Sequence, residues 1–219
     1  MAAPKFRTKR EFSPIGMLLH CHVNKPDSKF NPEKPRFKTK LVLEAEEGQA
    51  FKTKLEALLE QAWDAESADM KPADLKKWAK ASLPIDEELN DKDEPTGRLI
   101  FKFSQNARIK MKDGETKDIS IAVVDSKGKP AGKLKVFSGT MARVGYATRS
   151  YPKADGKLIG LTLDFDIVKV IKPSTRTMDT GPEDDGWTAD DSDNDFDDTS
   201  ESSTKAPQAA GSGEGSGDF

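Results

Sequence analysis

The chain has 219 residues, enough for one sizeable domain with appended segments, because a domain usually spans about 100–200 residues. Apolar residues make up 35% of the chain and charged residues 33%, against about 45–50% and about 25% in an average globular protein, which predicts that part of the sequence does not fold. No run approaches the ~18 apolar residues of a membrane span, and the lone Cys21 excludes an intramolecular disulfide, so we expect a reducing, intracellular location.

The net charge of −3 hides a strong division along the chain. Residues 174–219 carry 13 acidic and 2 basic residues, a net charge of −11, whereas residues 1–173 carry 25 acidic and 33 basic residues, a net charge of +8. Within that body, residues 44–94 are themselves acidic, with 15 acidic and 7 basic residues. A cationic body joined to an acidic tail is typical of a protein that binds nucleic acid.

The chain begins with a basic N-terminal arm, residues 1–15. Two strands are predicted after it, at Gly16–Val23 (GMLLHCHV) and Phe37–Leu43 (FKTKLVL), with a proline-rich loop between them. Period-two alternation in the second strand places Lys38 and Lys40 on one face.

A helical and acidic insertion, residues 48–94, interrupts the strand pattern. Apolar residues from Phe51 onward follow the spacing of an amphipathic helix, which we expect to end near Trp63. A second, shorter helix is expected after Pro72, because proline suits the first turn of a helix. The acidic segment Leu83–Thr96 is expected to be a loop.

Strand patterns then resume and continue almost to residue 173, separated by turn residues. They cover Leu99–Gln105, Ala107–Met111, Ile119–Val124, Lys133–Phe137, Met141–Tyr151 and Lys157–Ile171. Together with the earlier strands and one inserted helix, they predict a mainly β domain, residues 16–173, built as a small closed barrel or sandwich. Periodicity stops after Pro173, so residues 174–219 are expected to be a disordered acidic tail.

Two metal-binding patterns are considered and set aside. In the acidic run DDSDNDFDD, the sixth position from Asp191 is Phe196 where a calcium loop needs glycine, and the twelfth is Ser202 where it needs glutamate. In a strand, Cys21 points away from the histidine on each side, so the three cannot close one site. We therefore predict no metal and no cofactor.

Basic residues interleaved with aromatic residues are the remaining chemical signal. Single-stranded nucleic acid is held by a cationic groove that follows phosphates and by aromatic faces that stack on bases. Phe37, Phe101 and Phe103 are expected in the core. Tyr146 and Tyr151, both near arginines, are the expected stacking residues, because a tyrosine face tolerates a wet groove. The candidate contacts are Arg36, Lys38, Lys40, Lys102, Arg108, Lys110, Arg143, Tyr146, Arg149 and Tyr151.

The tail has candidate residues of its own. Its negative charge complements the cationic body, so it is expected to compete for the same groove. Aromatic residues are the anchors that a disordered segment needs to bind a partner specifically. The partner-binding candidates are Trp187, Phe196, Asp218 and Phe219.

The segment VVDSKGK (Val123–Lys129), preceded by IFKFSQNARIKMKDGETKDISIA and followed by a tyrosine-bearing strand, resembles the single-stranded DNA-binding protein of short-tailed coliphages. KPD (Lys25–Asp27), NP (Asn31–Pro32), the inserted helix and the terminal GDF (Gly217–Phe219) occur in the same order as in that family. The resemblance implies an OB-fold, a five-stranded Greek-key barrel with an inserted helix and extra strands. It also implies a protein that coats single-stranded DNA in phage replication, recombination and repair and promotes annealing of complementary strands.

The resemblance further implies a homodimer in the host cytoplasm, whose tail competes with DNA and contacts the phage DNA polymerase and helicase-primase through Phe219. The acidic insertion, the segment KPAGKLKVFSGT and a Ser/Gly-rich stretch of the tail depart from the family pattern. The groove residues that the resemblance carries over are Lys102, Arg108, Lys110, Arg143, Tyr146 and Tyr151.

Two other functions fit parts of the sequence. In a protein-interaction or chaperone factor, the acidic tail would be the working surface and the body would ignore DNA. A metal-dependent nuclease would need carboxylates that converge in the body, where Asp164 and Asp166 share a strand face. Because no nucleophile triad or phosphate-binding loop is present in the sequence, we expect no enzymatic activity.

Overall fold

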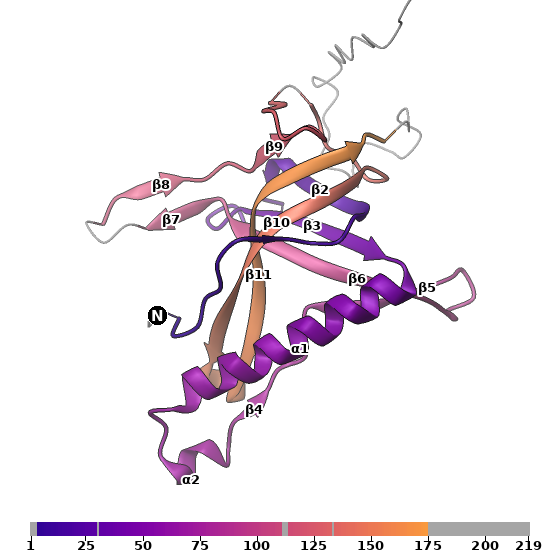
Figure 1. The fold of residues 1–219 in the computed structure, drawn as a ribbon. Coiled ribbons are helices and arrows are strands. Elements are labelled where there is room, and N and C mark those ends of the chain that lie inside the picture. The colour runs from indigo at the N-terminus through magenta and orange to yellow at the C-terminus, as the bar shows by residue number, and fades with distance from the viewer. Residues whose placement is uncertain (1–3, 30, 111–113, 133, 175–219) are drawn as a thin grey trace, which may run out of the picture. The chain divides into compact units, whose positions relative to one another are not determined.

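A sheet that closes into an OB-like barrel forms the body of the chain, of which the computed structural model describes residues 4–29, 31–110, 114–132 and 134–174 (Figure 1). Hydrogen-bonded neighbours follow the order β11–β10–β2–β3–β6, and contacts between β6 and β11 close the barrel. This confirms the mainly β, OB-like fold with an inserted helix. The barrel strands are β2 (Gly16–Asp27), β3 (Arg36–Leu43), β6 (Pro95–Asn106), β10 (Met141–Lys153) and β11 (Leu158–Lys172).

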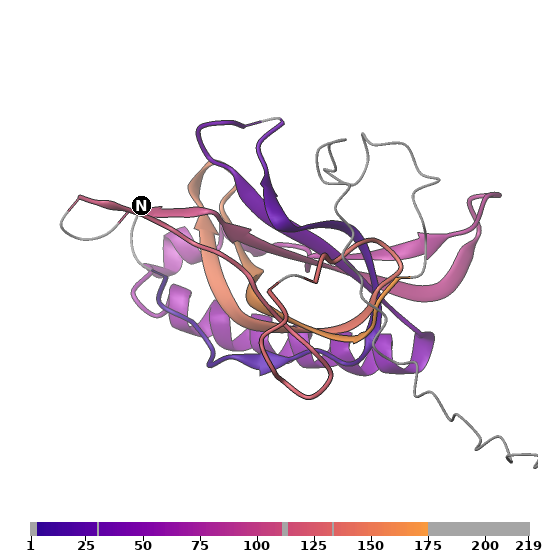
Figure 2. The ribbon, with the colours of Figure 1, turned by 90° about the horizontal axis from the view of Figure 1, so that it is seen from above.

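Several shorter elements complete the fold. A separate hairpin of β7 (Arg108–Lys110) and β8 (Thr116–Asp118) extends away from the barrel in both views (Figures 1 and 2). The 3-10 turn η1 (Ala154–Gly156) connects β10 to β11. The remaining strands are β1 (Glu11–Phe12) beside β10, β4 (Ala79–Lys80) and β9 (Ala122–Val124) beside β11, and β5 (Ile85–Leu89) beside β6.

The predicted helix is α1 (Ala45–Ser67), which packs along one side of the sheet (Figure 2). It buries Phe51, Leu55 and Leu59, which are four residues apart and so share one face. The helix continues past the predicted end at Trp63. The second helix, α2 (Pro72–Leu75), is shorter than predicted. Neither helix of the described part is both long enough and apolar enough to cross a membrane.

The prediction of a loop at Leu83–Thr96 is wrong, because this segment contains β5 and the start of β6. In β5 the side chains that point away from the core are acidic, so the segment has the composition of a loop although its side chains alternate as in a strand. Ile85 packs against the core, whereas Asp86 and Glu88 form ion pairs with Lys102 and Arg98 of β6.

Two other predicted strands are only partly present. Of Ile119–Val124, residues 122–124 form β9, which pairs in parallel with β11. Residues 134–137 of the predicted strand Lys133–Phe137 lie outside any strand. Val136 is nevertheless buried, and its backbone bonds to the Asn24 side chain, whose Nδ2 lies 3.3 Å from the Val136 carbonyl oxygen. A side chain therefore replaces the strand partner that the apolar pattern suggested.

Candidate nucleic-acid interface

Four of the cations on the outward surface of β3 and β6 are Arg36, Lys38, Lys40 and Lys102, here called the β3–β6 cationic face. Alternation along each strand explains them. Phe37, Phe101 and Phe103 are buried in the core, as predicted, so the residues between them point outward. Arg36, Lys38 and Lys102 are exposed and Lys40 is half-buried.

Pairing between the two strands brings these cations together. Lys40 lies directly opposite Lys102, while Lys38 lies opposite Ser104 and Arg36 opposite Asn106. Side chains opposite each other on antiparallel strands are about 5 Å apart at Cβ, and like charges in this position are destabilising. A lysine pair in this register is therefore suited to hold an anion between the two ammonium groups.

Carboxylates lie at both margins of the cationic face. Asp27 at the end of β2 accepts a hydrogen bond from Lys38, with 2.7 Å between Oδ2 and Nζ, and this bond lowers the pKa of the Asp27 carboxyl. Asp86 on β5 lies 2.6 Å from the Lys102 Nζ. Within the described ranges, no ion pair is found for Arg36 or Lys40.

His22 on β2 also belongs to this surface, since it lies opposite Lys38 and is half-buried. The strand alternation predicts that His22 points away from Cys21, and Cys21 is indeed buried, but the sequence gives no role for the histidine. Only the pairing of β2 with β3 brings it beside the lysine. Across the described residues, no group of three or more His, Cys, Asp or Glu side chains could hold a metal ion.

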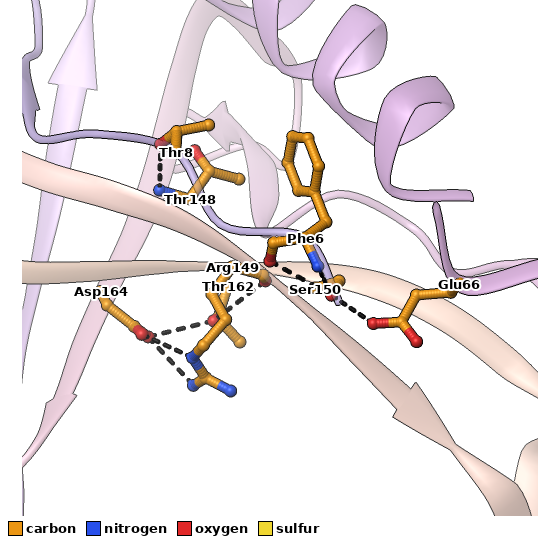
Figure 3. Close-up of polar contacts among 8 residues, drawn as sticks. All are labelled: Phe6, Thr8, Glu66, Thr148, Arg149, Ser150, Thr162 and Asp164. Atoms are coloured by element: carbon orange, nitrogen blue, oxygen red, sulfur yellow. Dashed lines mark hydrogen bonds and ion pairs between the residues drawn. The ribbon is translucent and has the colours of Figure 1, made fainter. Parts of the chain in front are cut away.

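The outer surface of β10 and β11 presents arginines in a different setting. Arg149 forms a two-pronged ion pair with Asp164, with Nε–Oδ2 and Nη2–Oδ1 distances of 2.6 and 3.2 Å, and Thr162 donates a hydrogen bond to the same carboxylate (Figure 3). Asp166 pairs with Arg10. Asp164 and Asp166, the two carboxylates considered for a nuclease, therefore both face arginines. Arg143 is exposed on β10, the strand that carries Arg149.

The N-terminal arm lies along the edge of β10. The Thr8 amide donates to the Thr148 carbonyl at 2.9 Å, and the Ser150 amide donates to the Phe6 carbonyl at 3.0 Å. Side chains add to this pairing, since the Phe6 amide donates to the Ser150 hydroxyl at 3.3 Å and the Thr148 amide donates to the Thr8 hydroxyl at 2.9 Å (Figure 3). Glu66, buried near the end of α1, accepts hydrogen bonds from the Lys5 amide at 3.0 Å and the Ser150 hydroxyl at 2.5 Å. The arm thus acts as an added strand, and it covers backbone groups of β10 that would otherwise form an open edge.

The prediction that Tyr146 faces a wet groove is wrong. Its side chain is 1% exposed, and its ring centroid lies 5.7 Å from that of Phe51 and 5.6 Å from that of Phe103. This burial raises the pKa of the Tyr146 hydroxyl. The signal was present in the sequence, because Tyr146 shares its period-two phase with the apolar residues Ala142 and Val144.

Tyr151, the other predicted stacking residue, is half-buried on β10. It lies opposite Gly160 of β11, and a Cβ atom built on that glycine would come within 2.6 Å of the tyrosine ring. The ring therefore covers the glycine backbone. Tyr151 is not part of the β3–β6 cationic face.

The remaining predicted residues are dispersed or outside the described part of the chain. Arg108 is exposed on the β7–β8 hairpin, with its Nε 3.3 Å from Asp118. Of the predicted contacts, the structure brings Arg36, Lys38, Lys40 and Lys102 onto one surface. The side chain of Lys110 and all of Trp187, Phe196, Asp218 and Phe219 lie outside the described residues.

The chain matches one known family and is similar to solved structures. The family described as "Single-stranded DNA-binding protein, Bacteriophage T7" matches residues 16–171. The structure of gp2.5, a single-stranded DNA-binding protein encoded by bacteriophage T7, is similar with a TM-score of 0.62 at 23% identity, covering 80% of this chain and 97% of that chain. None of the curated protein sequences matches.

A second solved relative is the single-stranded DNA-binding protein from bacteriophage Enc34. Its complex with single-stranded DNA gives a TM-score of 0.50 at 13% identity, covering 75% of this chain and 87% of that one. A C-terminal truncation of the same protein gives 0.51 at 14% identity, covering 77% and 88%. At these identities the likeness shows a shared fold.

Proposed function

We propose that this chain, which belongs to the bacteriophage T7 single-stranded DNA-binding protein family, binds single-stranded DNA without sequence specificity through the β3–β6 cationic face. The observation that carries the proposal is the placement of Lys40 directly opposite Lys102 on the outward side of the barrel. A like-charged pair costs stability unless an anion lies between its members, and the backbone of DNA supplies phosphates in a row.

Phosphate contacts are proposed to dominate the affinity. The aromatic residues of β3 and β6, Phe37, Phe101 and Phe103, all point into the core. Within these two strands no ring is therefore available for base stacking. A site of this kind loses affinity steeply with salt, with a slope of about −0.7 in log K against log salt for each phosphate contact to a single strand.

The proposed biological role is in phage DNA metabolism, as the family resemblance implies. The protein would protect single strands in phage replication, recombination and repair, and would promote annealing, as a homodimer in the host cytoplasm. It would act by binding rather than by catalysis, without a metal or cofactor. The strong charge division between body and tail supports such a role, because it favours reversible contacts with a polyanion.

The acidic tail is proposed to regulate this binding. Its net charge of −11 makes it a competitor for the cations of the body, which DNA must displace. Once displaced, the tail would recruit the phage DNA polymerase and helicase-primase. Trp187, Phe196, Asp218 and Phe219 are the proposed contacts.

Fluorescence titration of single- and double-stranded oligonucleotides tests the proposal. The full chain and a variant lacking residues 174–219 are compared at about 50 and about 200 mM salt, a range over which phosphate-dominated binding falls by orders of magnitude. We expect preference for the single strand, a steep fall with salt and tighter binding without the tail. Weaker binding after truncation would contradict tail competition, and a body that ignores DNA would favour the protein-interaction function.

A further inference from the structure

The cations of the β3–β6 cationic face are of two kinds. Lys38 and Lys102 are held by carboxylates, whereas Arg36 and Lys40 have no ion-pair partner in the part of the chain that the structure describes. Arg36 and Lys38 are two residues apart on β3, and Lys40 and Lys102 lie opposite each other. Held and available cations therefore alternate across one surface.

Asp86 holds Lys102 from the neighbouring strand β5. Its two carboxylate oxygens lie 2.7 and 2.6 Å from the lysine Nζ. The side chains of Lys102 and Asp86 are 46% and 44% exposed, so water and ions reach both. An exposed ion pair of this kind contributes little to stability, and stability alone does not explain why a carboxylate lies there.

Asp27 holds Lys38 from the other margin, at the end of β2. Its side chain is only 12% exposed, while that of Lys38 is 47% exposed. The carboxylate also accepts a hydrogen bond from the Lys29 amide at 3.1 Å, which fixes its position. Asp27 therefore stays in place while Lys38 is free to turn toward an anion in solvent.

We propose that Asp27 and Asp86 are resident competitors of DNA: each occupies one lysine of the β3–β6 cationic face, and a phosphate that binds there must replace the carboxylate. The inference rests on the proposed function. It assigns to two acidic side chains of the body a control of affinity that is separate from the tail.

Counterion release makes this control measurable. When a phosphate binds a free lysine, it releases condensed cations from the DNA, which produces the salt dependence. When a phosphate replaces a carboxylate, the freed carboxylate attracts a cation in turn, and the net release is smaller. Lys38 and Lys102 therefore add less to the salt slope than Arg36 and Lys40 do.

The test compares full-length Asp86→Asn with the unchanged protein, titrating a fluorescent oligothymidylate at several salt concentrations. We expect the affinity at low salt to rise by up to about fivefold, the factor equivalent to an exposed ion pair. The slope of log K against log salt should become steeper by up to about 0.7. Asp27→Asn should act in the same direction through Lys38.

Glu60→Gln is the matched control, because Glu60 forms an exposed ion pair with Lys80, away from β3 and β6. It removes the same charge and should change the affinity less than about twofold, with the slope unchanged. In a Lys102→Gln background, Asp86→Asn should lose its effect. Thermal melting of each variant checks that the fold is retained.

The outcomes separate the two proposals. An unchanged protein that does not bind the oligonucleotide overturns both. If the unchanged protein binds and Lys102→Gln weakens binding, but Asp86→Asn behaves like Glu60→Gln, the competitor inference alone is overturned. A gain that persists in the Lys102→Gln background also overturns it, because the effect then does not pass through that lysine.

Discussion

Two outer surfaces of the barrel carry cations that the sequence singled out, and their surroundings differ. On the β3–β6 cationic face, Lys40 lies opposite Lys102. On the outer surface of β10 and β11, the Arg149 guanidinium is held by Asp164 in a two-pronged ion pair. Whether a cation on these surfaces is available to phosphate therefore depends on the side chains around it and not on the basic residue alone.

The two surfaces also differ in what removing a cation leaves behind. Removing Lys40 relieves a like-charge contact, so it should cost little stability and much affinity. Removing Arg149 leaves the Asp164 side chain, which is 14% exposed, without its main partner. That change should cost stability and little affinity.

The largest expected effect is on DNA binding by the β3–β6 cationic face. Reversing two charges in Lys40→Glu/Lys102→Glu should weaken single-strand binding at low salt on the order of 100-fold, because each reversal turns an attraction for phosphate into a repulsion. Fluorescence anisotropy measures the affinity. Lys71→Glu/Lys76→Glu is the matched control, since these exposed lysines flank α2 and the variant has the same net charge. Equal losses in both variants would mean that overall charge, not this face, holds the DNA.

A smaller effect, on the free energy of unfolding, is expected from removing Arg149 on the outer surface of β10 and β11. Arg149→Gln should lower the free energy of unfolding by about 1–2 kcal/mol, because Asp164 loses two charge-assisted hydrogen bonds. Urea denaturation measures this, and the DNA affinity should change less than about twofold. Arg143→Gln removes an exposed arginine of the same strand β10 that has no ion pair within the described residues, so it should leave the free energy of unfolding unchanged. A large loss of DNA affinity in Arg149→Gln with the fold intact would remove the contrast between the surfaces.

The smallest effect is expected for Tyr146, a predicted DNA contact that lies in the core. Within the described residues, the buried Tyr146 hydroxyl has no hydrogen-bond partner, so Tyr146→Phe should raise the free energy of unfolding by about 1 kcal/mol. DNA affinity should not change. Tyr151→Phe is the control on the outer surface. Reduced DNA binding by Tyr146→Phe would restore the stacking role.

The burial of Tyr146 also predicts how the free energy of unfolding depends on pH. Because burial raises the pKa of Tyr146, the folded chain keeps this proton at a pH where the unfolded chain, with a tyrosine pKa of about 10, releases it. Above about pH 10 the unfolded state therefore binds fewer protons, and stability falls as pH rises. Denaturation of the unchanged protein at rising alkaline pH should show this fall. Tyr146→Phe should lose that part of it.

Periodicity predicted much of the fold because it reports local structure. The alternation around Phe37 and Phe101 indicated strands with cations on one side, and the spacing from Phe51 indicated the helix. The register that opposes Lys40 to Lys102 could not be predicted, since it depends on two strands separated by the whole insertion. For Tyr146, the phase of the strand indicates the core correctly, whereas the nearby arginines suggest a wet surface.

Other features were hidden by composition. The basic residues of the arm gave no sign of its attachment, because its partners Thr148 and Ser150 are far along the chain. In β5 the acidic residues that form ion pairs with β6 resembled those of a solvated loop. In both segments the structure depends on a distant partner, which a local pattern does not contain.

The attachment of the arm has a consequence for biosynthesis. Phe6 bonds to Ser150, a residue that the ribosome adds 144 positions later. At about 5–20 residues per second, Phe6 waits roughly 7 to 30 seconds for the strand that receives it. Barrel closure is therefore a late event of translation, and until then the first strands need protection from pairing with neighbouring nascent chains on the same messenger.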